Sequence, residues 1–157
     1  MRNNFQIFAL QEKEFTNLFL MNEEELKSIG AVKMIANVNP GYPCRISLKD
    51  AEVGEEVFLL NYQYHNVNSP YKASGPIFIR KEATTAKLDI NEIPQMLQHR
   101  YLSVRGYNAD SMIVEAKVTE GENLRENIDE IFDNKKVDYI HILNAKPGCY
   151  NCLVNRV

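Results

Sequence analysis

Hydrophobic residues recur at strand spacing along most of the chain and at helical spacing in a few short segments. The longest strand-like run covers residues 55–65, where apolar and aromatic side chains alternate. The clearest helical pattern is the apolar series Leu124, Ile128, Ile131 and Phe132. Because strands outnumber helices and follow one another in hairpin-like order, we predict an α+β fold. It should contain a mainly antiparallel sheet, a few short helices and a C-terminal β-hairpin.

The other predicted elements are shorter. Strands are expected at residues 5–10, 31–38, 44–48, 76–80, 100–105 and 111–119, and helices at residues 12–20 and 90–99. A further helix should begin after Asn22, because Glu25 follows three residues later as in a capping box. Gly30 is a natural end for that helix.

The C-terminal hairpin allows a prediction of strand register. Residues 145–148, Ala-Lys-Pro-Gly, form a four-residue turn, so Leu143 should face Tyr150 and His141 should face Cys152. Directly opposed residues have Cβ atoms roughly 5 Å apart, close enough for an imidazole and a thiol to interact. This contact would lower the pKa of the Cys152 thiol. The alternative is that Cys152 packs as a small apolar residue beside His141.

Composition indicates one globular domain. The 157 residues are 45% apolar and 25% charged, which predicts a single domain spanning residues 1–157. The net charge is −3 and the basic residues are scattered, so we expect no nucleic-acid partner. The N-terminus lacks the apolar core of a signal peptide, and no apolar run is long enough for a membrane helix. We therefore expect no membrane partner and a cytoplasmic location, where the three cysteines would stay reduced.

Cys149 and Cys152 have the spacing of zinc-binding and redox cysteine pairs. In a regular strand, however, residues three apart point to opposite faces, and no helix start follows Cys152. We therefore predict no metal centre. If zinc were bound, its ligands would come from Cys44, Cys149, Cys152 and His141; the cofactor is otherwise left open.

Several short motifs stand in order along the second part of the chain. They are Pro43-Cys44-Arg45, the turn at residues 50–55, Gly75-Pro76-Ile77-Phe78, Arg105-Gly106-Tyr107, and the end from His141 through Cys149-Tyr150-Asn151-Cys152 to Arg156. Their order and spacing, from about residue 42 to residue 156, resemble the bacterial domain-of-unknown-function family 1203. The family has no assigned activity, so the resemblance implies no reaction. Many of its members show a second cysteine in Pro-Cys-Arg-x-Cys, where this chain has Ser47. A site that needs four thiolates would be incomplete here.

Four further polar residues are candidates for ligand binding: Arg45, His65, Arg105 and Tyr107. Arginines at strand ends can hold a carboxylate or phosphate with two hydrogen bonds. The alternative is that they form separate ion pairs with the 21 acidic residues. His65 ends a strand beside a proline-containing loop, a common place for a site, although an exposed strand-end histidine would look the same.

Our leading hypothesis is a small domain that binds a small ligand, with an anion among the options. The pocket would be lined by Cys44, Arg45, His65, Arg105, His141 and Cys152. The first alternative is a thiol-dependent enzyme or redox sensor that uses Cys152 or Cys44 with His141. The second is a structural protein without a small-molecule site. Whether the protein is an enzyme, and its oligomeric state, are left open by the sequence.

Overall fold

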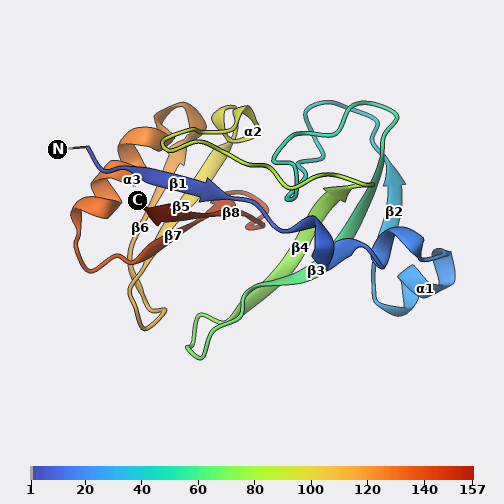
Figure 1. The fold of residues 1–157 in the computed structure, drawn as a ribbon, viewed down its shortest axis with the longest axis horizontal. Helices are drawn as coiled ribbons and strands as arrows, with labels where there is room; N and C mark the ends of the chain where they lie inside the picture. Colours follow the sequence, from blue (N-terminus) through green and yellow to red (C-terminus); the bar gives the residue numbers. More distant parts are fainter. Residues whose placement is uncertain (1) are drawn as a thin grey trace.

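The computed structural model describes residues 2–157, which form two antiparallel sheets (Figure 1). Within these residues the larger sheet has five strands, in the order β1-β8-β7-β5-β6, and the smaller has three, in the order β2-β3-β4. The strands are β1 (Phe5–Phe8), β2 (Val32–Ile35), β3 (Glu56–His65), β4 (Ala73–Arg80), β5 (Tyr101–Tyr107), β6 (Ile113–Glu120), β7 (Tyr139–Asn144) and β8 (Tyr150–Arg156). The helices are α1 (Glu23–Ser28), α2 (Gln95–Gln98) and α3 (Leu124–Asp133), with 3-10 turns η1 (Glu12–Phe15), η2 (Leu18–Leu20) and η3 (Gly121–Asn123).

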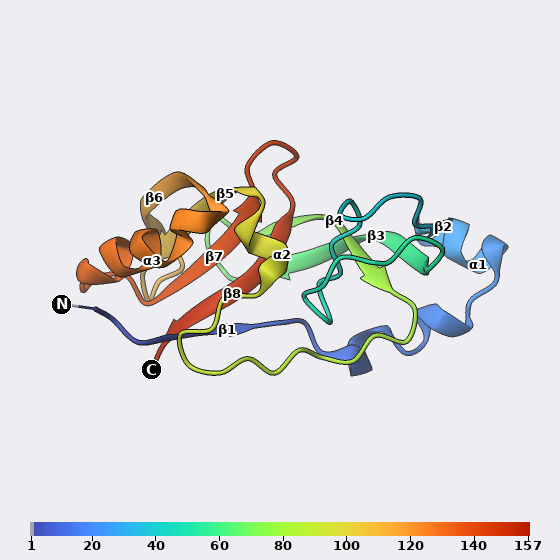
Figure 2. The same ribbon diagram turned by 90° about the horizontal axis from the view of Figure 1, so that it is seen from above.

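The two sheets make two lobes that follow one another along the long axis of the molecule (Figure 2). The predicted α+β class, with antiparallel strands, short helices and a C-terminal hairpin, is confirmed. No helix within residues 2–157 combines the length and the apolar character needed to cross a bilayer. The single-domain prediction includes Met1, which lies outside the described residues, and it stays a prediction.

The chain passes between the lobes twice. It starts in the larger sheet with β1, builds the lobe of the smaller sheet, and returns through residues 81–94 (Figure 1). The returning segment lies along β1. The amide of Asn91 donates to the carbonyl of Phe5 at 2.8 Å, and the side chain of Gln6 donates to the carbonyl of Leu88 at 2.8 Å. These hydrogen bonds join distant parts of the chain. They attach the returning segment to β1, which is a strand of the larger sheet.

Helix α3 covers one face of the larger sheet, as its apolar spacing predicts. Its four predicted core residues are fully buried: Leu124, Ile128, Ile131 and Phe132. They share a hydrophobic cluster with inward-facing residues of the sheet, including Leu102, Ile142 and Cys152. Burying a side chain of this size contributes roughly 1.5–3 kcal/mol, so this cluster is the main core of the larger lobe.

Helix α1 begins as predicted. The side chain of Asn22 accepts a hydrogen bond from the amide of Glu25 at 2.9 Å, and the Glu25 carboxylate accepts one from the amide of Asn22 at 3.1 Å. This reciprocal pair satisfies two amides that the helix itself leaves free. Gly30 follows the helix with a φ of +74°, a conformation that favours glycine.

Two predicted elements are replaced by tighter turns. The segment predicted as one helix at residues 12–20 forms the 3-10 turns η1 and η2, because so short a helix is marginal without an extensive apolar face. The segment at residues 44–48, predicted as extended, forms a compact loop instead. In this loop the amide of Leu48 donates to the carbonyl of Cys44 at 3.0 Å, and Leu48 has a φ of 51°.

The helix predicted at residues 90–99 is confined to α2. Pro94 has an extended backbone, with ψ at 144°, and stands just before the helix. A proline disfavours helical geometry in the residue that precedes it, so the helix cannot extend toward residue 90. The apolar residues of this segment reach the core from a single turn, in which Met96 and Leu97 are buried.

The C-terminal hairpin forms, but it contains a bulge. The observed partners are Leu143 with Tyr150, Ile142 with Cys152, and His141 with Leu153. The predicted partner of Leu143 is therefore confirmed, whereas the pairing of His141 with Cys152 is wrong. Asn151 is the extra residue of β8 at the register shift, because β8 passes from Tyr150 to Cys152 while β7 advances by one residue.

Gly121 provides a test of the packing between η3 and α2. A Cβ atom at this position would lie 1.9 Å from the carbonyl oxygen of Leu97, a contact that only a backbone shift could relieve. We expect Gly121→Ala to lower the free energy of unfolding by about 3 kcal/mol. Urea denaturation followed by circular dichroism measures this change. Gly75→Ala is the control, because its Cβ would meet only Tyr64 Cε1, at an ordinary 3.8 Å. Equal effects of the two substitutions would contradict the packing described.

Candidate functional site

Two histidines from different sheets meet at the junction of the lobes. His65 ends β3 in the smaller sheet, His141 lies in β7 of the larger sheet, and their ring centroids are 4.6 Å apart. Four tyrosines surround them: Tyr64, Tyr107, Tyr139 and Tyr150. We call these six residues the His–Tyr cluster. The pairing of β3 with β4 shifts between Tyr62 and His65, and beyond this irregularity the consecutive residues Tyr64 and His65 both contact His141.

The hydrogen bonds of His65 define its tautomer. Its Nδ1 lies 2.8 Å from the carbonyl oxygen of Tyr71, which can only accept, so Nδ1 carries the proton in the neutral ring. Its Nε2 lies 2.6 Å from the hydroxyl of Tyr139, which therefore donates to it. The Tyr139 oxygen also lies 3.0 Å from the hydroxyl oxygen of Ser111, so these three side chains form one hydrogen-bonded chain. Both nitrogens of His65 are thus occupied by neighbouring groups.

His141 is buried, and its Nδ1 is unpaired. The residue is 4% exposed, and within residues 2–157 its Nδ1 has no hydrogen-bond partner. Burial lowers the pKa of His141 to about 3, with smaller contributions from the nearby His65 and Arg105. The imidazole is therefore neutral at physiological pH and packs as a polar member of the cluster.

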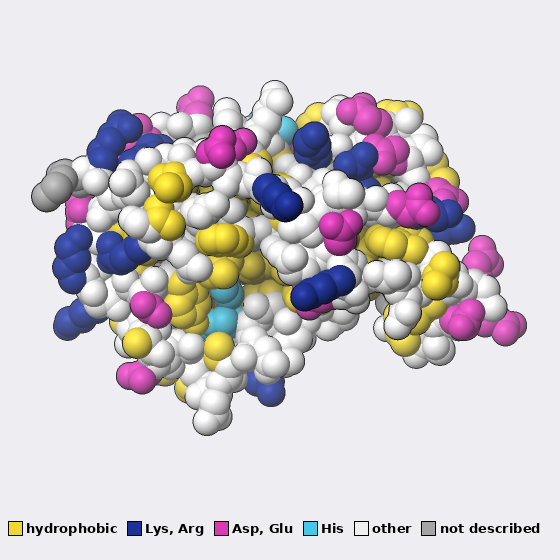
Figure 3. Space-filling view, viewed as in Figure 1, with side chains coloured by type: hydrophobic (Ala, Val, Ile, Leu, Met, Phe, Trp, Pro, Cys, Tyr) yellow, Lys and Arg dark blue, Asp and Glu magenta, His cyan; other side chains and the backbone are white. Residues whose placement is uncertain are grey.

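The structure brings together three of the four predicted ligand-binding residues. His65 and Tyr107 have ring centroids 4.5 Å apart, and Arg105 faces His141 across β5 and β7. His65 and Tyr107 are nearly fully buried, and Arg105 donates from Nε to the hydroxyl of Ser103 at 3.1 Å. Histidine atoms are visible in the hollow between the two lobes (Figure 3). The same view shows basic and acidic side chains interspersed over this face of the molecule.

Two of the three cysteines lie in hydrophobic cores. Cys152 is fully buried in the core beneath α3, and burial raises the pKa of its thiol to about 12. This shift is opposite in direction to the one expected from an imidazole partner. Cys44 is fully buried in the core of the smaller lobe, where its sulfur accepts from the amides of Ser47 at 3.4 Å and Arg80 at 3.2 Å. Neither sulfur is paired with His141 in the way the sequence suggested.

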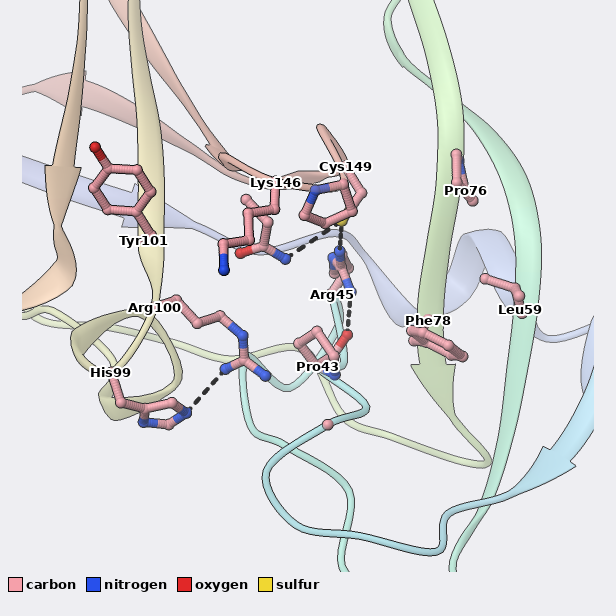
Figure 4. Close-up of a pocket in the computed structure, with 13 residues that line it drawn as sticks. Pro43, Arg45, Leu59, Pro76, Phe78, His99, Arg100, Tyr101, Lys146 and Cys149 are labelled. Atoms are coloured by element: carbon pink, nitrogen blue, oxygen red, sulfur yellow. Dashed lines mark hydrogen bonds between the residues drawn. The ribbon is translucent and has the colours of Figure 1, made fainter.

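The third cysteine lines a cavity of about 530 Å³ between the lobes. Leu59, Pro76 and Phe78, from β3 and β4, form an apolar wall (Figure 4). The opposite side carries basic residues and Cys149, which stands at the end of the hairpin turn (Figure 4). The basic residues are Arg45, Arg100 and Lys146. We call this cavity the Arg45 cleft.

Among residues 2–157, Arg45 is the largest side chain that is fully buried. Its Nε donates to the carbonyl of Tyr150 at 2.7 Å, one terminal nitrogen donates to the carbonyl of Pro43, and the other donates to Cys149 Sγ at 3.1 Å. Within residues 2–157 no carboxylate forms an ion pair with this guanidinium. Burial lowers the pKa of Arg45, and the adjacent Cys149 opposes this effect.

Cys149 is half-buried and its sulfur accepts two hydrogen bonds. One comes from Arg45, and the other comes from the side-chain amide of Asn144 at 3.3 Å. The side-chain oxygen of Asn144 accepts in turn from the side-chain amide of Asn151, at 2.8 Å. Asn151 is the bulge residue of the hairpin and is completely buried. Its hydrogen bond to Asn144 helps to orient the Asn144 side chain toward the sulfur.

Arg100, unlike Arg45, has an acidic partner. Its two terminal nitrogens donate to the two carboxylate oxygens of Asp50, at 2.9 and 2.5 Å. His99 lies 3.3 Å from the same carboxylate. This arrangement compensates the charge of Arg100 at the edge of the cleft. Lys146 is exposed in the hairpin turn and has no ion pair within the described part of the chain.

A second hollow, of about 1150 Å³, is lined in part by Asp50 and His99. It is lined by charged side chains of both signs, and its Arg80 is paired with Glu55 at 2.9 Å. This mixture of charges does not select one kind of ligand. The Arg45 cleft is distinguished by basic groups that face an apolar wall.

The predicted pocket is therefore divided among separate places. Arg45 lines the cleft, His65, Arg105 and His141 belong to the junction of the lobes, and Cys44 and Cys152 lie in two cores. Among residues 2–157 no three Cys, His, Asp or Glu side chains are grouped so that they could hold a metal ion. The four residues named as zinc ligands are thus not assembled in this structure.

Sequence reasoning missed three features of the cleft: the role of Cys149 beside Arg45, and the positions of Lys146 and Arg100. A signal for the first two was present, because Lys146 and Cys149 flank the tip of a predicted turn. No local signal connects this turn with Arg45, which lies more than a hundred residues earlier.

These features define a two-sheet α+β protein with a basic, thiol-containing cleft between its lobes. A family model described as "Protein of unknown function (DUF1203)" matches residues 41–156, and the chain belongs to this family. All residues that line the Arg45 cleft fall within the matched segment. Searches of curated proteins and of solved structures found no match to the chain.

The buried His141 predicts a pH dependence of stability. Between pH 6.5 and about pH 3 the unfolded chain binds a proton at this histidine that the folded protein does not, so the free energy of unfolding falls as pH decreases. The maximal slope for one group is about 1.4 kcal/mol per pH unit. We expect His141→Phe to remove about 3 kcal/mol of the loss between pH 7 and pH 4, as measured by denaturant unfolding.

Ile140→Val is the matched control, because it changes a fully buried residue of the same strand that carries no titratable group. It should leave the pH dependence as it is in the unmodified protein. A His141→Phe protein with an unchanged slope would show that His141 takes up its proton as readily in the folded state as in the unfolded chain.

Proposed function

We propose that the protein binds a small organic anion in the Arg45 cleft. The single observation that carries this proposal is the buried guanidinium of Arg45, which lines the cleft and has no carboxylate partner within the described residues. A buried charge is strongly destabilising unless an opposite charge or sufficient hydrogen bonds compensate it. An anion that enters the cleft would supply the missing charge.

The hydrogen-bonding capacity of Arg45 supports the same conclusion. A guanidinium has five N–H groups, and three are used, by Pro43, Cys149 and Tyr150. Two N–H groups of this buried side chain therefore have no acceptor within residues 2–157. A carboxylate, sulfonate or phosphate oxygen is the type of acceptor that binds arginine most strongly.

The volume of the cleft and its apolar wall indicate the size and the apolar character of the ligand. A volume of about 530 Å³ is in the range of small-molecule sites. The wall formed by Leu59, Pro76 and Phe78 offers an apolar surface opposite the basic groups. The cleft is thus suited to a molecule with one anionic end and an apolar or aromatic body. Lys146, at the mouth, adds a positive charge that favours entry of such a molecule.

The alternative functions have less support. A thiol enzyme or redox sensor built on Cys152 or Cys44 with His141 would need an accessible sulfur near the imidazole. Both sulfurs are fully buried, and Cys152 faces the core rather than His141. A purely structural role would account for the hydrogen bonds of Arg45 to both sheets, but it would leave the charge of Arg45 beside the cavity without a neutralising carboxylate.

Binding of anilinonaphthalene sulfonate, a fluorescent aromatic anion, tests the proposal. We expect saturable binding to the native protein and a dissociation constant about fivefold higher for Lys146→Glu, because the substitution replaces an attractive charge with a repulsive one. Neutral phenylnaphthylamine should bind more weakly than the sulfonate and should be insensitive to the substitution. Fluorescence titration measures both affinities.

Lys136→Glu is the control for net charge. It makes the same change in charge, but Lys136 lies beyond the opposite end of β7 and does not line the cleft. Its affinity for the sulfonate should equal that of the unmodified protein. Equal weakening by the two substitutions, or no saturable binding at all, would overturn the proposed site.

A further inference from the structure

We propose that Cys149 is a reactive thiol that undergoes thiol–disulfide exchange with small, negatively charged disulfides admitted to the Arg45 cleft. The inference rests on the proposed function, because the cleft must first accept the anion. It adds a covalent step to that site and names a class of substrate for it.

Accessibility separates Cys149 from the other two cysteines. Cys44 and Cys152 are fully buried in separate cores, whereas Cys149 is half-buried and lines the cleft. A disulfide reagent that approaches the folded protein through the cleft therefore meets one sulfur. Access is a condition for exchange, since the attacking and the attacked sulfur atoms must come into line.

The surroundings of Cys149 favour a negative charge on sulfur during the reaction. Arg45 and Asn144 both direct N–H groups at the sulfur, at 3.1 and 3.3 Å. Reactive cysteines are found in such electropositive, partly exposed places. The buried guanidinium of Arg45 also has no carboxylate partner within residues 2–157, and this missing charge points to an anionic partner at this position.

The proposed step balances without a further oxidant. The Cys149 thiol gives its proton to solvent, and its sulfur attacks one sulfur of the disulfide R–S–S–R. A bond forms between the Cys149 sulfur and R–S, the original S–S bond breaks, and the departing R–S⁻ takes up a proton as pH requires. The Cys149 sulfur is oxidised, and the departing sulfur is reduced to a thiol.

The mixed disulfide should persist. A second exchange within the protein would need another thiol that can reach the modified Cys149. Cys152 is held in the core beneath α3, and the sulfur of Cys44 is held by two backbone amides in the smaller lobe. The folded protein should therefore release one thiol per chain and form no internal disulfide.

The reaction is tested with dithiobis(nitrobenzoate), an aromatic disulfide that carries two carboxylates. The native protein should release one thionitrobenzoate per chain, and peptide mapping should place the adduct on Cys149. Cys149→Ser should abolish this release, whereas Cys44→Ser should retain it. In guanidinium chloride the unmodified protein should release up to three, which shows that all its thiols are free to react when exposed.

Selectivity is measured against neutral dithiodipyridine. We expect Lys146→Glu to lower the ratio of the two rate constants, anionic over neutral, by about tenfold, and Lys136→Glu to leave it unchanged. Equal ratios in the two variants, modification of Cys44 or Cys152 in the folded protein, or release of a second thionitrobenzoate would overturn the inference.

Titration of the Cys149→Ser protein with anilinonaphthalene sulfonate separates the inference from the proposed function. If this variant binds the sulfonate and the unmodified protein shows no exchange at Cys149, the anion site stands and the thiol reaction is refuted. If neither variant nor unmodified protein binds the sulfonate, the proposed function fails. If the exchange rate at Cys149 is then also independent of the charge of the reagent, the inference is refuted as well.

Discussion

The buried guanidinium of Arg45 is the constraint that the arrangement of the two lobes depends on. Its side chain donates to the carbonyl of Tyr150 in the larger sheet, while its backbone amide donates to the carbonyl of Phe78 in the smaller sheet, at 3.1 Å. Its own carbonyl accepts from the amide of Leu10 at 3.0 Å, where the chain first passes between the lobes. One residue therefore connects both sheets and the crossing segment. Such a set of bonds keeps the residue buried although its charge is costly to desolvate.

The bulge in β8 determines which sulfur faces which environment. With a regular ladder, Cys152 would have stood beside His141. The extra residue Asn151 instead places Cys152 opposite Ile142 in the core, where burial raises the pKa of its thiol. Cys149, just before β8, is left at the cleft. Bulges often redirect side chains at functional sites, and this one divides two closely spaced cysteines between a core and a cavity.

Tyr150 connects the two polar regions at the junction. Its ring stacks on Tyr64 of the smaller sheet at 4.8 Å and contacts His141, while its carbonyl accepts from Arg45. The His–Tyr cluster and the Arg45 cleft therefore share one anchoring residue. The cluster packs aromatic rings from both sheets against the buried, neutral imidazole of His141, and these contacts hold the lobes together.

The sequence alone determined the elements whose signals are local: the capping box before α1, the apolar face of α3, the long strand β3 and the presence of the C-terminal hairpin. These follow from side-chain periodicity and from hydrogen bonds between residues three or four apart. It also identified Arg45, His65 and Arg105 as candidates, and its motifs pointed to the family. Only the tertiary structure decided the rest. The bulge at Asn151, the burial of Cys44 and Cys152, and the contact between Arg45 and Cys149 arise from packing between segments far apart in the chain, and local patterns carry no information about which distant side chains will meet.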